Sequence, residues 1–444
     1  MSARTVFLFP GLGAYSAGVL RQARPEYPQV GQVFREIDEV AREHGVPPVS
    51  AALFGPRPLS VQDMQERPAE LLHLAIFGVS VATQRILCDE GLRPYALVGH
   101  SFGEIAALVS SGAFDLADGV RLVCARAAAL KEWEGRGAMA AISANVEVTA
   151  HLIGALDEPE LVIACVNAPG QTVISGPVAA IDRAEPVARA LGLFFTRLYL
   201  PYASHHPSMR RAVGHFVDLT AGLRQRPMDL PVLSPIHGRR YADEDDLRRL
   251  LAECLVLPVR FSDAVRGLHE RGATTFIETG ALRALTRCVE LTVPGVTTFA
   301  PLLEPEEEVE GLRRAATGQA RTRVQPAPTA SAAGQARPRR EPLVMMSTDA
   351  IAPETPRRHA PSRADVVGRL RDLYAEALEY PPDVLTEAAL LEADLGVDSL
   401  KQTALLSRVF ETFGFPDGAE GMRGLDFPSL GRIADHILAQ TAPQ

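Results

Sequence analysis

Long apolar runs are missing from this sequence. No stretch stands out as a membrane span, and the N-terminus, MSARTVFLFPG, lacks the apolar core of a secretion signal. Cysteine is sparse, and the five cysteines form no close pair of the metal-binding kind: Cys88, Cys124, Cys165, Cys254 and Cys288. We therefore expect reduced thiols, no metal and no membrane contact in a cytoplasmic protein.

Length and composition are those of a globular protein with more than one domain. At 444 residues, with 47% apolar and 22% charged residues, the chain has room for two or three cores. Charge is unevenly spread, because residues 362–444 carry 7 basic and 14 acidic side chains whereas residues 311–361 carry 9 arginines against 3 acids. The acidic terminal piece argues against nucleic-acid binding and favours docking onto basic protein surfaces.

The stretch between these regions has the composition of a linker. Residues 321–342, RTRVQPAPTASAAGQARPRREP, contain almost no large apolar side chain, so they cannot bury enough surface to offset the entropy of ordering. We expect a flexible tether over residues 304–361 whose ends lie on the order of 40 Å apart. Its arginines leave contact with RNA or an acidic partner open, although a solvated linker is the simpler interpretation.

A nucleophile motif lies in residues 95–111, YALVGHSFGEIAALVSS. An apolar strand leads into the G-x-S-x-G pattern around Ser101, and a helical segment follows. Strand, G-x-S-x-G and helix together are typical of a nucleophile elbow, in which glycines permit the tight turn. The elbow exposes the hydroxyl at a helix N-terminus, where the next backbone N–H can stabilise an oxyanion. The sequence therefore predicts an α/β-hydrolase-like body over residues 1–303 with Ser101 as nucleophile.

A serine nucleophile needs a base to take its proton. Among 11 histidines, His205 and His206 stand out. They lie in the segment LPYASHHPSM, residues 200–209, which follows a strand-like run at residues 193–200. Two adjacent histidines at a strand exit are, taken alone, typical of a solvated loop. The presence of a partner serine favours one of them as the base.

A smaller pattern lies between the serine and the histidines. Residues 138–200 alternate in the order strand, helix, strand, strand, helix, strand. This is the ferredoxin-like order, and it predicts a small subdomain inserted in the larger body.

Residues 5 to about 303 resemble the malonyl-CoA:acyl-carrier-protein transacylases and the acyltransferase domains of polyketide synthases. Five motifs in the family's order carry the resemblance: FPGLG at 9–13, GHSFGE at 99–104, YASHHPSM at 202–209, PVRFSDAV at 258–265 and FIETG at 276–280. In that family the serine of the first G-H-S motif is acylated, which implies Ser101. The catalytic histidine directly follows the serine of the Y-A-S-H motif, which implies His205 rather than His206.

The resemblance also implies the groups that support this pair. The family's oxyanion hole uses backbone N–H groups, here those of Leu12 and Phe102, and a backbone carbonyl at about Cys254 holds the imidazole. Leu12 stands where the family usually has Gln, and Cys254 where it often has Gln or Asn. Because both roles use the backbone, neither departure disables the site.

Arg126 bears on the substrate class. The family binds the free carboxylate of malonyl or methylmalonyl with an arginine 25 residues after the serine, and Arg126 has this spacing from Ser101. A guanidinium matches a carboxylate in a bidentate way, although a surface arginine on an amphipathic helix is the plainer interpretation. His100, Tyr202 and Ser204 are further expected substrate contacts. The Y-A-S-H motif is typical of methylmalonyl domains, but Phe102 replaces their usual Gln, so the acyl group stays open.

The C-terminal region, residues 362–444, reads as a four-helix-bundle carrier domain. Apolar residues recur at helical spacing on two segments: Val366, Leu370, Leu373 and Ala377, and Leu405, Leu406, Val409, Phe410 and Phe413. The motif LGVDSL resembles that of acyl carrier proteins, whose serine, here Ser399, takes a 4′-phosphopantetheine arm. A helix start favours the phosphodiester, and Ser399 needs no local base because it is a tether point.

The combined hypothesis is an acyltransferase fused to its own carrier. Ser101 takes an acyl group from acyl-CoA and passes it to a pantetheine thiol, and a phosphopantetheinyl transferase and polyketide or hybrid synthase proteins such as a ketosynthase are the expected partners. No ketosynthase or reductase motif is present in the sequence. Open alternatives are an editing thioesterase, transfer of an unusual acyl group between carriers, and a large domain used only for docking.

Overall fold

A computed structural model describes residues 4–198 and 200–318, together with residues 362–378, 385–387, 391, 405–406, 408–410, 412–413, 427 and 429–441. The chain divides into two compact units, Met1–Arg321 and Thr322–Gln444, and each is described by itself. All five cysteines lie in the described residues, and none of them forms a disulfide.

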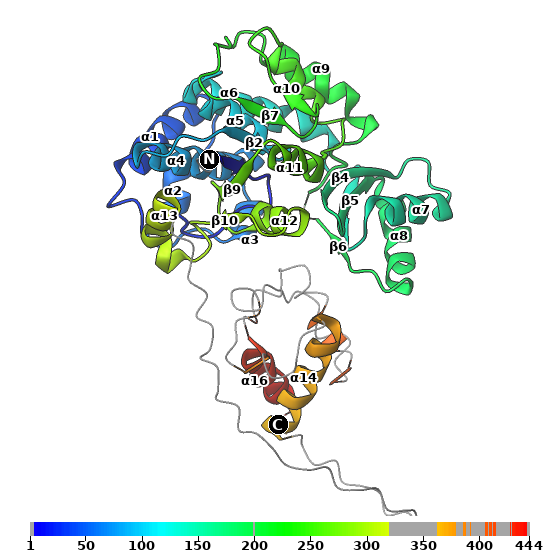
Figure 1. The fold of residues 1–444 in the computed structure, drawn as a ribbon. Helices are drawn as coiled ribbons and strands as arrows, with labels where there is room; N and C mark the ends of the chain where they lie inside the picture. Colours follow the sequence, from blue (N-terminus) through cyan, green and yellow to red (C-terminus); the bar gives the residue numbers. More distant parts are fainter. Residues whose placement is uncertain are drawn as a thin grey trace, which may run out of the picture. The chain divides into compact units, whose positions relative to one another are not determined.

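The first unit is built around a six-stranded sheet (Figure 1). In spatial order its strands are β10 (Thr297–Phe299), β9 (Ala273–Glu278), β1 (Arg4–Phe9), β2 (Ala96–Gly99), β7 (Val232–Ser234) and β8 (Arg239–Arg240). Every neighbouring pair is parallel except β7 and β8. β2 is buried along its whole length, as expected for a central parallel strand covered on both faces.

Helices cover this sheet and make up most of the body. They are α1 (Pro28–Glu43), α2 (Val49–Phe54), α3 (Val61–Gln65), α4 (Ala69–Asp89), α5 (Gly103–Ser110), α6 (Leu116–Leu130), α9 (Arg210–Leu219), α10 (Leu247–Glu253), α11 (Phe261–Glu270), α12 (Ala284–Thr292) and α13 (Glu308–Thr317). Short 3₁₀ turns η1 (Lys131–Trp133), η2 (Pro207–Met209) and η3 (Pro305–Glu307) join some of them. The sequence thus yields the predicted α/β body.

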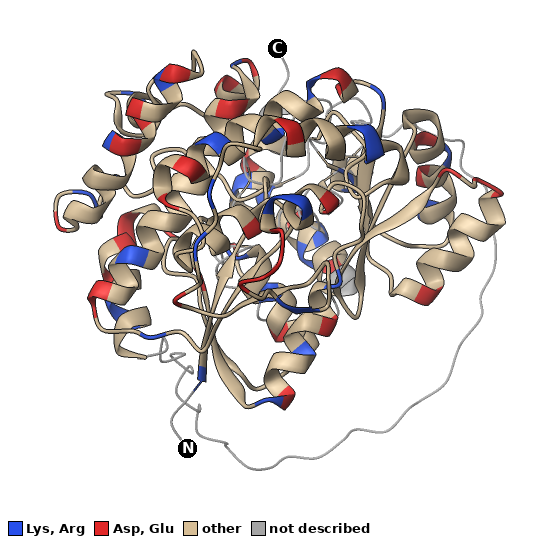
Figure 2. Cartoon of the chain, turned by 90° about the horizontal axis from the view of Figure 1, so that it is seen from above, with Lys and Arg blue, Asp and Glu red and all other residues tan. Residues whose placement is uncertain are grey.

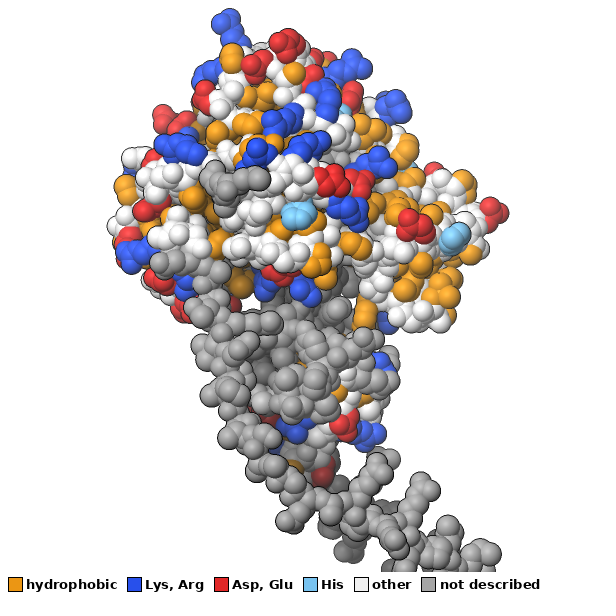
Figure 3. Space-filling model, in the orientation of Figure 1, with side chains coloured by type: hydrophobic (Ala, Val, Ile, Leu, Met, Phe, Trp, Pro, Cys, Tyr) orange, Lys and Arg blue, Asp and Glu red, His pale blue; other side chains and the backbone are white. Residues whose placement is uncertain are grey.

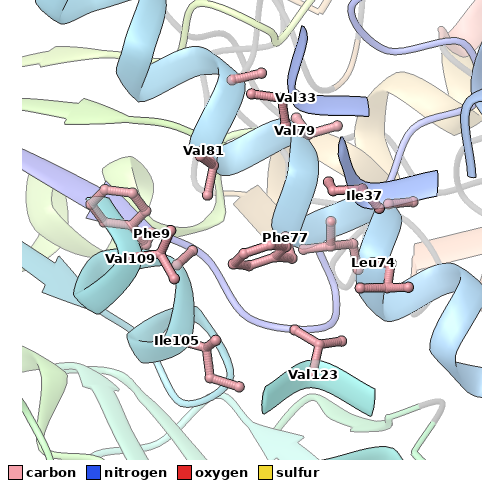
Figure 4. Packing of buried hydrophobic residues seen from close by; sticks show 14 of the residues in the cluster. Phe9, Val33, Ile37, Leu74, Phe77, Val79, Val81, Ile105, Val109 and Val123 are labelled. Atoms are coloured by element: carbon pink, nitrogen blue, oxygen red, sulfur yellow. The ribbon is translucent and has the colours of Figure 1, made fainter. Parts of the chain in front are cut away.

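Helix α4 runs through the core. It packs against α1, α5 and α6, and Figure 4 shows its residue Phe77 lying among apolar side chains of the neighbouring helices. By length and composition α4 is apolar enough to cross a membrane, which the sequence analysis did not expect. Its most apolar window is 83% buried inside the body, so α4 is explained as a core helix.

The inserted subdomain has the predicted ferredoxin-like arrangement. Its elements run β3 (Ala138–Ile142), α7 (Val146–Leu156), β4 (Val162–Ala168), β5 (Gln171–Gly176), α8 (Val178–Ala190) and β6 (Phe195–Arg197). The sheet order is β4-β5-β3-β6, and all its pairs are antiparallel. α7 and α8 bury their apolar faces on this sheet around Ile174 and Ile181. The ferredoxin-like prediction is therefore confirmed.

The body extends further than predicted. The linker was expected from residue 304, but α13 follows η3 and buries Leu312 and Ala315 in the main core. Glu308 is also buried, and its carboxylate accepts hydrogen bonds from the N–H groups of Leu20, Gln22 and Ala23. The charged segment around α13 was read as linker because its few apolar residues gave a weak helical signal. The boundary at 303 is thus corrected to at least Gly318.

The described part of the second unit contains two helices, α14 (Arg363–Leu378) and α16 (Leu430–Thr441). They pack on a common core that includes Val366, Leu370, Leu405, Val409 and Ile437. The two apolar faces that the sequence predicts thus share one core. Much of the predicted four-helix bundle lies outside the described residues.

Charge is distributed over the outer helices of the body. Figure 2 shows acidic and basic residues interspersed on the helices, while the strands carry few charges. Figure 3 shows that apolar side chains are also visible on the inserted subdomain, where Val148 and Leu191 are exposed large apolar residues.

Candidate active site

Ser101 lies in the sharp turn between β2 and α5. Its backbone is left-handed, with φ of 54°, which a residue with a Cβ adopts only where the surroundings hold it. A side chain at Gly103 would collide with the carbonyl of Phe9, and one at Gly99 would collide with the backbone of Glu104. The two glycines of the motif are therefore required by close backbone approach, and the predicted nucleophile elbow is formed.

The loop that carries His205 and His206, here called the histidine loop, contacts the elbow at Ser101. Ser101 Oγ lies 2.7 Å from Nε2 of His205, although 104 residues separate them. His205 Nδ1 lies 2.9 Å from the carbonyl oxygen of Leu257. Because a carbonyl only accepts, Nδ1 carries the hydrogen and Nε2 is free to accept the serine proton. His206 points elsewhere, and its Nε2 lies 2.7 Å from the carbonyl oxygen of Glu160.

The orienting carbonyl differs from the expected one. Leu257, three residues after Cys254, provides the hydrogen bond to His205, and the Cys254 carbonyl has only a lesser influence on the pKa of this imidazole. The Cys254 thiol instead donates to Glu104 Oε2 at 3.1 Å. The chain turns between α10 and the P-V-R-F motif at residues 258–261. The conformation of this turn decides which backbone carbonyl lies within hydrogen-bond distance of the imidazole.

His205 is buried and held neutral. Burial lowers the pKa of its imidazole from 6.5 to about 3, opposed by the hydrogen bond to Leu257 and reinforced by the nearby His100 and the positive charge of Arg126. A neutral imidazole is the form that can take a proton from serine. The site therefore keeps its base ready at neutral pH.

Glu104, the last residue of the G-H-S-F-G-E motif, was not assigned a role from the sequence. It is fully buried, and its carboxylate accepts hydrogen bonds from Ser234 at 2.5 Å and Tyr241 at 2.7 Å as well as from Cys254. Burial raises the pKa of this carboxyl. The network ties α5 to β7 and to the residues that directly follow β8 and α10, and it fixes the helix that begins two residues after the nucleophile.

The loop that carries Leu12 lies beside the elbow. The His100 N–H donates to the carbonyl of Phe9, and a Cβ on Gly11 would sit 3.2 Å from the His100 carbonyl oxygen. Within the described part of the chain, the N–H groups of Leu12 and Phe102 have no hydrogen-bond partner. The Phe102 N–H directly follows Ser101 in the chain, and the Leu12 N–H lies in the loop that packs on His100, so both donors are available for the oxyanion hole that the resemblance implies.

A small pocket opens from Ser101. Its walls are Ser101, Phe102, Ile105, Arg126, Phe216, Leu251, Cys254 and Leu255. Arg126, on α6, is only 6% exposed, and its guanidinium lies over the Phe102 ring at 5.5 Å. Its Nη1 atom is buried without a hydrogen-bond partner among the described residues. The structure thus places an unpaired buried cation in the same pocket as the nucleophile.

The other expected substrate contacts do not line this pocket: Tyr202 and Ser204 are buried, and His100 is half-buried. His100 Nε2 lies 2.8 Å from Asn167 Oδ1 in the inserted subdomain. The hydroxyls of Tyr202 and Ser204 are buried and have no partner among the described residues. His73, on α4, was missed by the sequence analysis; its ring contacts Phe102, and burial followed by the charge of Arg126 lowers its pKa to about 3.

Ser399, the expected phosphopantetheine attachment point, lies outside the described residues. No group of three or more His, Cys, Asp or Glu side chains that could hold a metal is found in the part of the chain that the structure describes.

Comparison with known proteins gives two family matches. Residues 6–326 match the acyl transferase domain family, and residues 368–437 match the phosphopantetheine attachment site family. The first covers well over half of the chain. The second includes Ser399 and supports a covalent phosphopantetheine in the C-terminal unit.

Similar proteins include large synthases. The chain is 30% identical over 315 residues to the non-reducing polyketide synthase aoiG of Aspergillus oryzae, covering 68% of this chain and 14% of that protein. It is 29% identical over 314 residues to mycoketide-CoA synthase of Mycobacterium tuberculosis, covering 70% and 7%. The chain therefore spans less than a fifth of the length of these relatives.

Solved structures that resemble this chain include acyltransferases. The acyltransferase domain from module 8 of the salinomycin polyketide synthase is 28% identical, with a TM-score of 0.65 over 71% of this chain and 76% of that one. The malonyl CoA-acyl carrier protein transacylase of Coxiella burnetii is 25% identical, with a TM-score of 0.64 over 71% and 98%.

These matches fit the elbow, the histidine and the two-unit architecture already described. The chain therefore belongs to the acyl transferase domain family of polyketide synthases and malonyl transacylases, and it carries a phosphopantetheine attachment domain at its C-terminal end.

Proposed function

We propose that the protein transfers an acyl extender unit from CoA, through an ester on Ser101, to the thiol of a pantetheinylated carrier protein. The extender is malonyl, methylmalonyl or another 2-substituted malonyl group. The carrier is its own C-terminal domain or that of a partner, and polyketide synthase proteins use the product in the cytoplasm. The single observation that supports this most is the unpaired Arg126 cation in the pocket of Ser101.

The first half-reaction forms the acyl-enzyme. Ser101 Oγ attacks the thioester carbonyl carbon as His205 Nε2 takes its proton, and the N–H groups of Leu12 and Phe102 stabilise the resulting oxyanion. The carbon–sulfur bond then breaks, and His205 returns the proton to the departing CoA sulfur. The Leu257 carbonyl holds the imidazole in the required tautomer and stabilises it while it is charged.

The second half-reaction empties the serine. When bound to the carrier, phosphopantetheine supplies an acceptor thiol. His205 Nε2 takes the thiol proton as the sulfur attacks the ester carbonyl, and the same two N–H groups hold the oxyanion. The ester bond breaks, and the proton passes from His205 to Ser101 Oγ, so the enzyme is restored.

Arg126 supports a dicarboxylic acyl group. A buried guanidinium without a partner is costly, and a malonyl carboxylate would supply the missing charge and hydrogen bonds. The remaining pocket walls are largely apolar, so they offer no competing anion. An acetyl or propionyl group would leave the cation unpaired, which favours substrates with a free carboxylate.

The test compares Arg126→Ala with wild type for acylation by malonyl-CoA and acetyl-CoA, read by intact-protein mass spectrometry. Losing a hydrogen bond to a charged group costs about 1.5–3 kcal/mol, so malonyl transfer should fall at least about tenfold. Acetyl transfer should hold or rise. Arg121→Ala is the matched control, because Arg121 lies on the same helix and pairs with Asp118 at the surface.

Three outcomes would count against the proposal. An equal fall for both substrates would make Arg126 structural, and no acylation of wild type by any acyl-CoA would remove the transferase function. Steady release of free CoA without any pantetheinylated acceptor would show an editing hydrolase instead.

A further inference from the structure

Strand β4 of the inserted subdomain and Glu160 just before it contact residues that lie next to Ser101, Leu257 and His205 in the chain. Near the end of the strand, Asn167 bonds to His100, the residue before Ser101. In its middle, Ala164 and Val166 exchange backbone hydrogen bonds of 2.8 Å with Val259, two residues after Leu257. The serine and the orienting carbonyl are therefore each anchored to one strand.

The third contact comes from His206, the residue after the catalytic histidine. Its Nε2 lies 2.7 Å from the carbonyl oxygen of Glu160, two residues before β4 begins. Its Nδ1 accepts the N–H of Ser208 at 3.1 Å and lies 2.7 Å from the Ser208 hydroxyl. Nδ1 is thus the acceptor, and Nε2 carries the hydrogen that is donated to Glu160.

His206 is buried, and its ring nitrogens and backbone groups all have hydrogen-bond partners. The side chain is 6% exposed, and its backbone N–H donates to the Leu255 carbonyl at 3.2 Å. A histidine that served only as a solvated loop residue would not be buried with both ring nitrogens bound. His206 therefore joins the histidine loop to the inserted subdomain.

The histidine loop that His206 ties to the subdomain contains a strained residue, His205. His205 has φ of 58°, a left-handed conformation that a residue with a Cβ keeps only when its surroundings over-determine it. The imidazole is fixed on one side by Leu257, and the chain directly after it is fixed by His206. Releasing His206 would let the loop relax and turn Nε2 away from Ser101.

We propose that His206 is a positioning residue, which sets the aim of His205 by tying the histidine loop to the Glu160 carbonyl of the inserted subdomain. This inference rests on the proposed acyl transfer. His206 does not touch the reacting atoms, so it acts on the rate of the chemical step and leaves substrate binding unchanged.

The test measures single-turnover acylation of Ser101 by malonyl-CoA in the full chain. His206→Phe keeps a planar aromatic ring, though a larger one, and removes both hydrogen bonds, so the maximal rate should fall about 10- to 100-fold, the size of effect that a misplacement of about 1 Å produces. The malonyl-CoA concentration for half-maximal rate should stay within about twofold. His206→Gln can still donate to Glu160 and should keep the rate within about threefold of wild type.

Two controls separate positioning from general damage. His215→Ala removes an exposed histidine of α9 and should leave the rate unchanged. If His206→Phe fails to fold, His206→Gln is compared with His206→Asn, whose shorter side chain can accept from Ser208 but cannot reach Glu160. The maximal rate of His206→Gln should then exceed that of His206→Asn at least about fivefold.

Equal maximal rates for His206→Phe and wild type would overturn the inference, and so would equal maximal rates for His206→Gln and His206→Asn. A loss seen only as weaker malonyl-CoA binding would also overturn it. Failure of the proposed function has a different signature, because wild type itself would then form no ester on Ser101.

Discussion

The body and the inserted subdomain of the first unit contribute unequally to the candidate site. The body supplies Ser101 from the end of a buried parallel strand, His205 from a loop, and Arg126 from a helix. The subdomain supplies one side-chain amide, Asn167, and one backbone carbonyl, that of Glu160. The reactive groups come from the body, whereas the contacts that fix them come from both regions, because the Leu257 carbonyl of the body also orients His205.

The two sheets explain this division. β2 is buried on both faces and points its carboxyl end at the site, which gives a rigid base for a strained turn. β4 is only partly buried, in the pattern of an edge strand, and its free edge is available to bond the body. The buried sheet of the body thus supports the nucleophile, and the edge strand β4 helps to align the segments around the catalytic pair.

The largest effect should follow removal of the nucleophile in the body. Ser101→Ala should abolish acylation by acyl-CoA, because no other described residue occupies the elbow, while pantetheinylation of the carrier unit should remain. Ser399→Ala should show the reverse, with an ester at Ser101 but no terminal acceptor. Intact-protein mass spectrometry reads both, and a phosphopantetheine mass on Ser399→Ala would refute the carrier assignment.

Removal of the base should cost somewhat less. His205→Ala should slow acyl-enzyme formation at least about 1,000-fold, because an uncharged serine hydroxyl is a poor nucleophile. Rapid-quench acylation assays measure it, with exposed His215→Ala as the control. A smaller loss than in His206→Phe would reverse the order of the two histidines and break the distinction between reacting and positioning groups.

A pair of glycines compares the packing of the two regions. Gly103→Ala forces a methyl group against the Phe9 carbonyl, so it should distort the elbow, lower the thermal midpoint and reduce acylation about 100-fold or more. Gly170→Ala, in the hairpin between β4 and β5, meets nothing within 4 Å and should be nearly neutral. Similar losses in both variants would show that the subdomain is as tightly constrained as the body.

Loss of one subdomain contact should have a modest effect. Asn167→Ala removes the hydrogen bond to His100, and that half-buried imidazole then loses its side-chain partner. We expect the acylation rate to fall about three- to tenfold, with little change in half-saturating malonyl-CoA. A loss as large as that of His205→Ala would mean that Asn167 contacts the reacting group itself.

The smallest effect concerns pH. Because burial lowers the pKa of His205 to about 3, its imidazole stays neutral at pH 5, and the acylation rate there should lie within about twofold of that at pH 7.5. An imidazole with the ordinary pKa of about 6.5 would be only about 3% neutral at pH 5, so the rate would drop about 30-fold. That drop, measured per folded molecule, would contradict the assigned environment.

The folded fraction must be followed in the same experiment. The unfolded chain binds a proton on this histidine as pH falls through about 6.5, whereas the folded protein does not until about pH 3. The contribution of His205 to stability is therefore greatest above pH 6.5 and declines toward acid. Circular dichroism at each pH separates this loss of folded protein from loss of the base.

Much of the site could be predicted because its signals are local. The glycines around Ser101 are fixed by the geometry of the turn itself, and the ferredoxin-like order follows from the alternation of apolar residues. The choice of His205 over His206 came from a motif resemblance, and the structure brings that imidazole to the serine. The end of the body could not be predicted, since α13 is held by burial of Glu308, Leu312 and Ala315.

The sequence by itself determined the nucleophile turn and the order of the elements, because side-chain chemistry and local backbone limits act between neighbouring residues. The role of Arg126 was implied by the family resemblance, and the packing of α6 places this side chain in the pocket. Only the tertiary structure decided that Leu257 rather than Cys254 holds His205, and that Glu160 receives His206. Both of these partners are backbone carbonyls, which every residue possesses. Which carbonyl comes within hydrogen-bond distance depends on how distant segments pack, so no residue type in the sequence marks it.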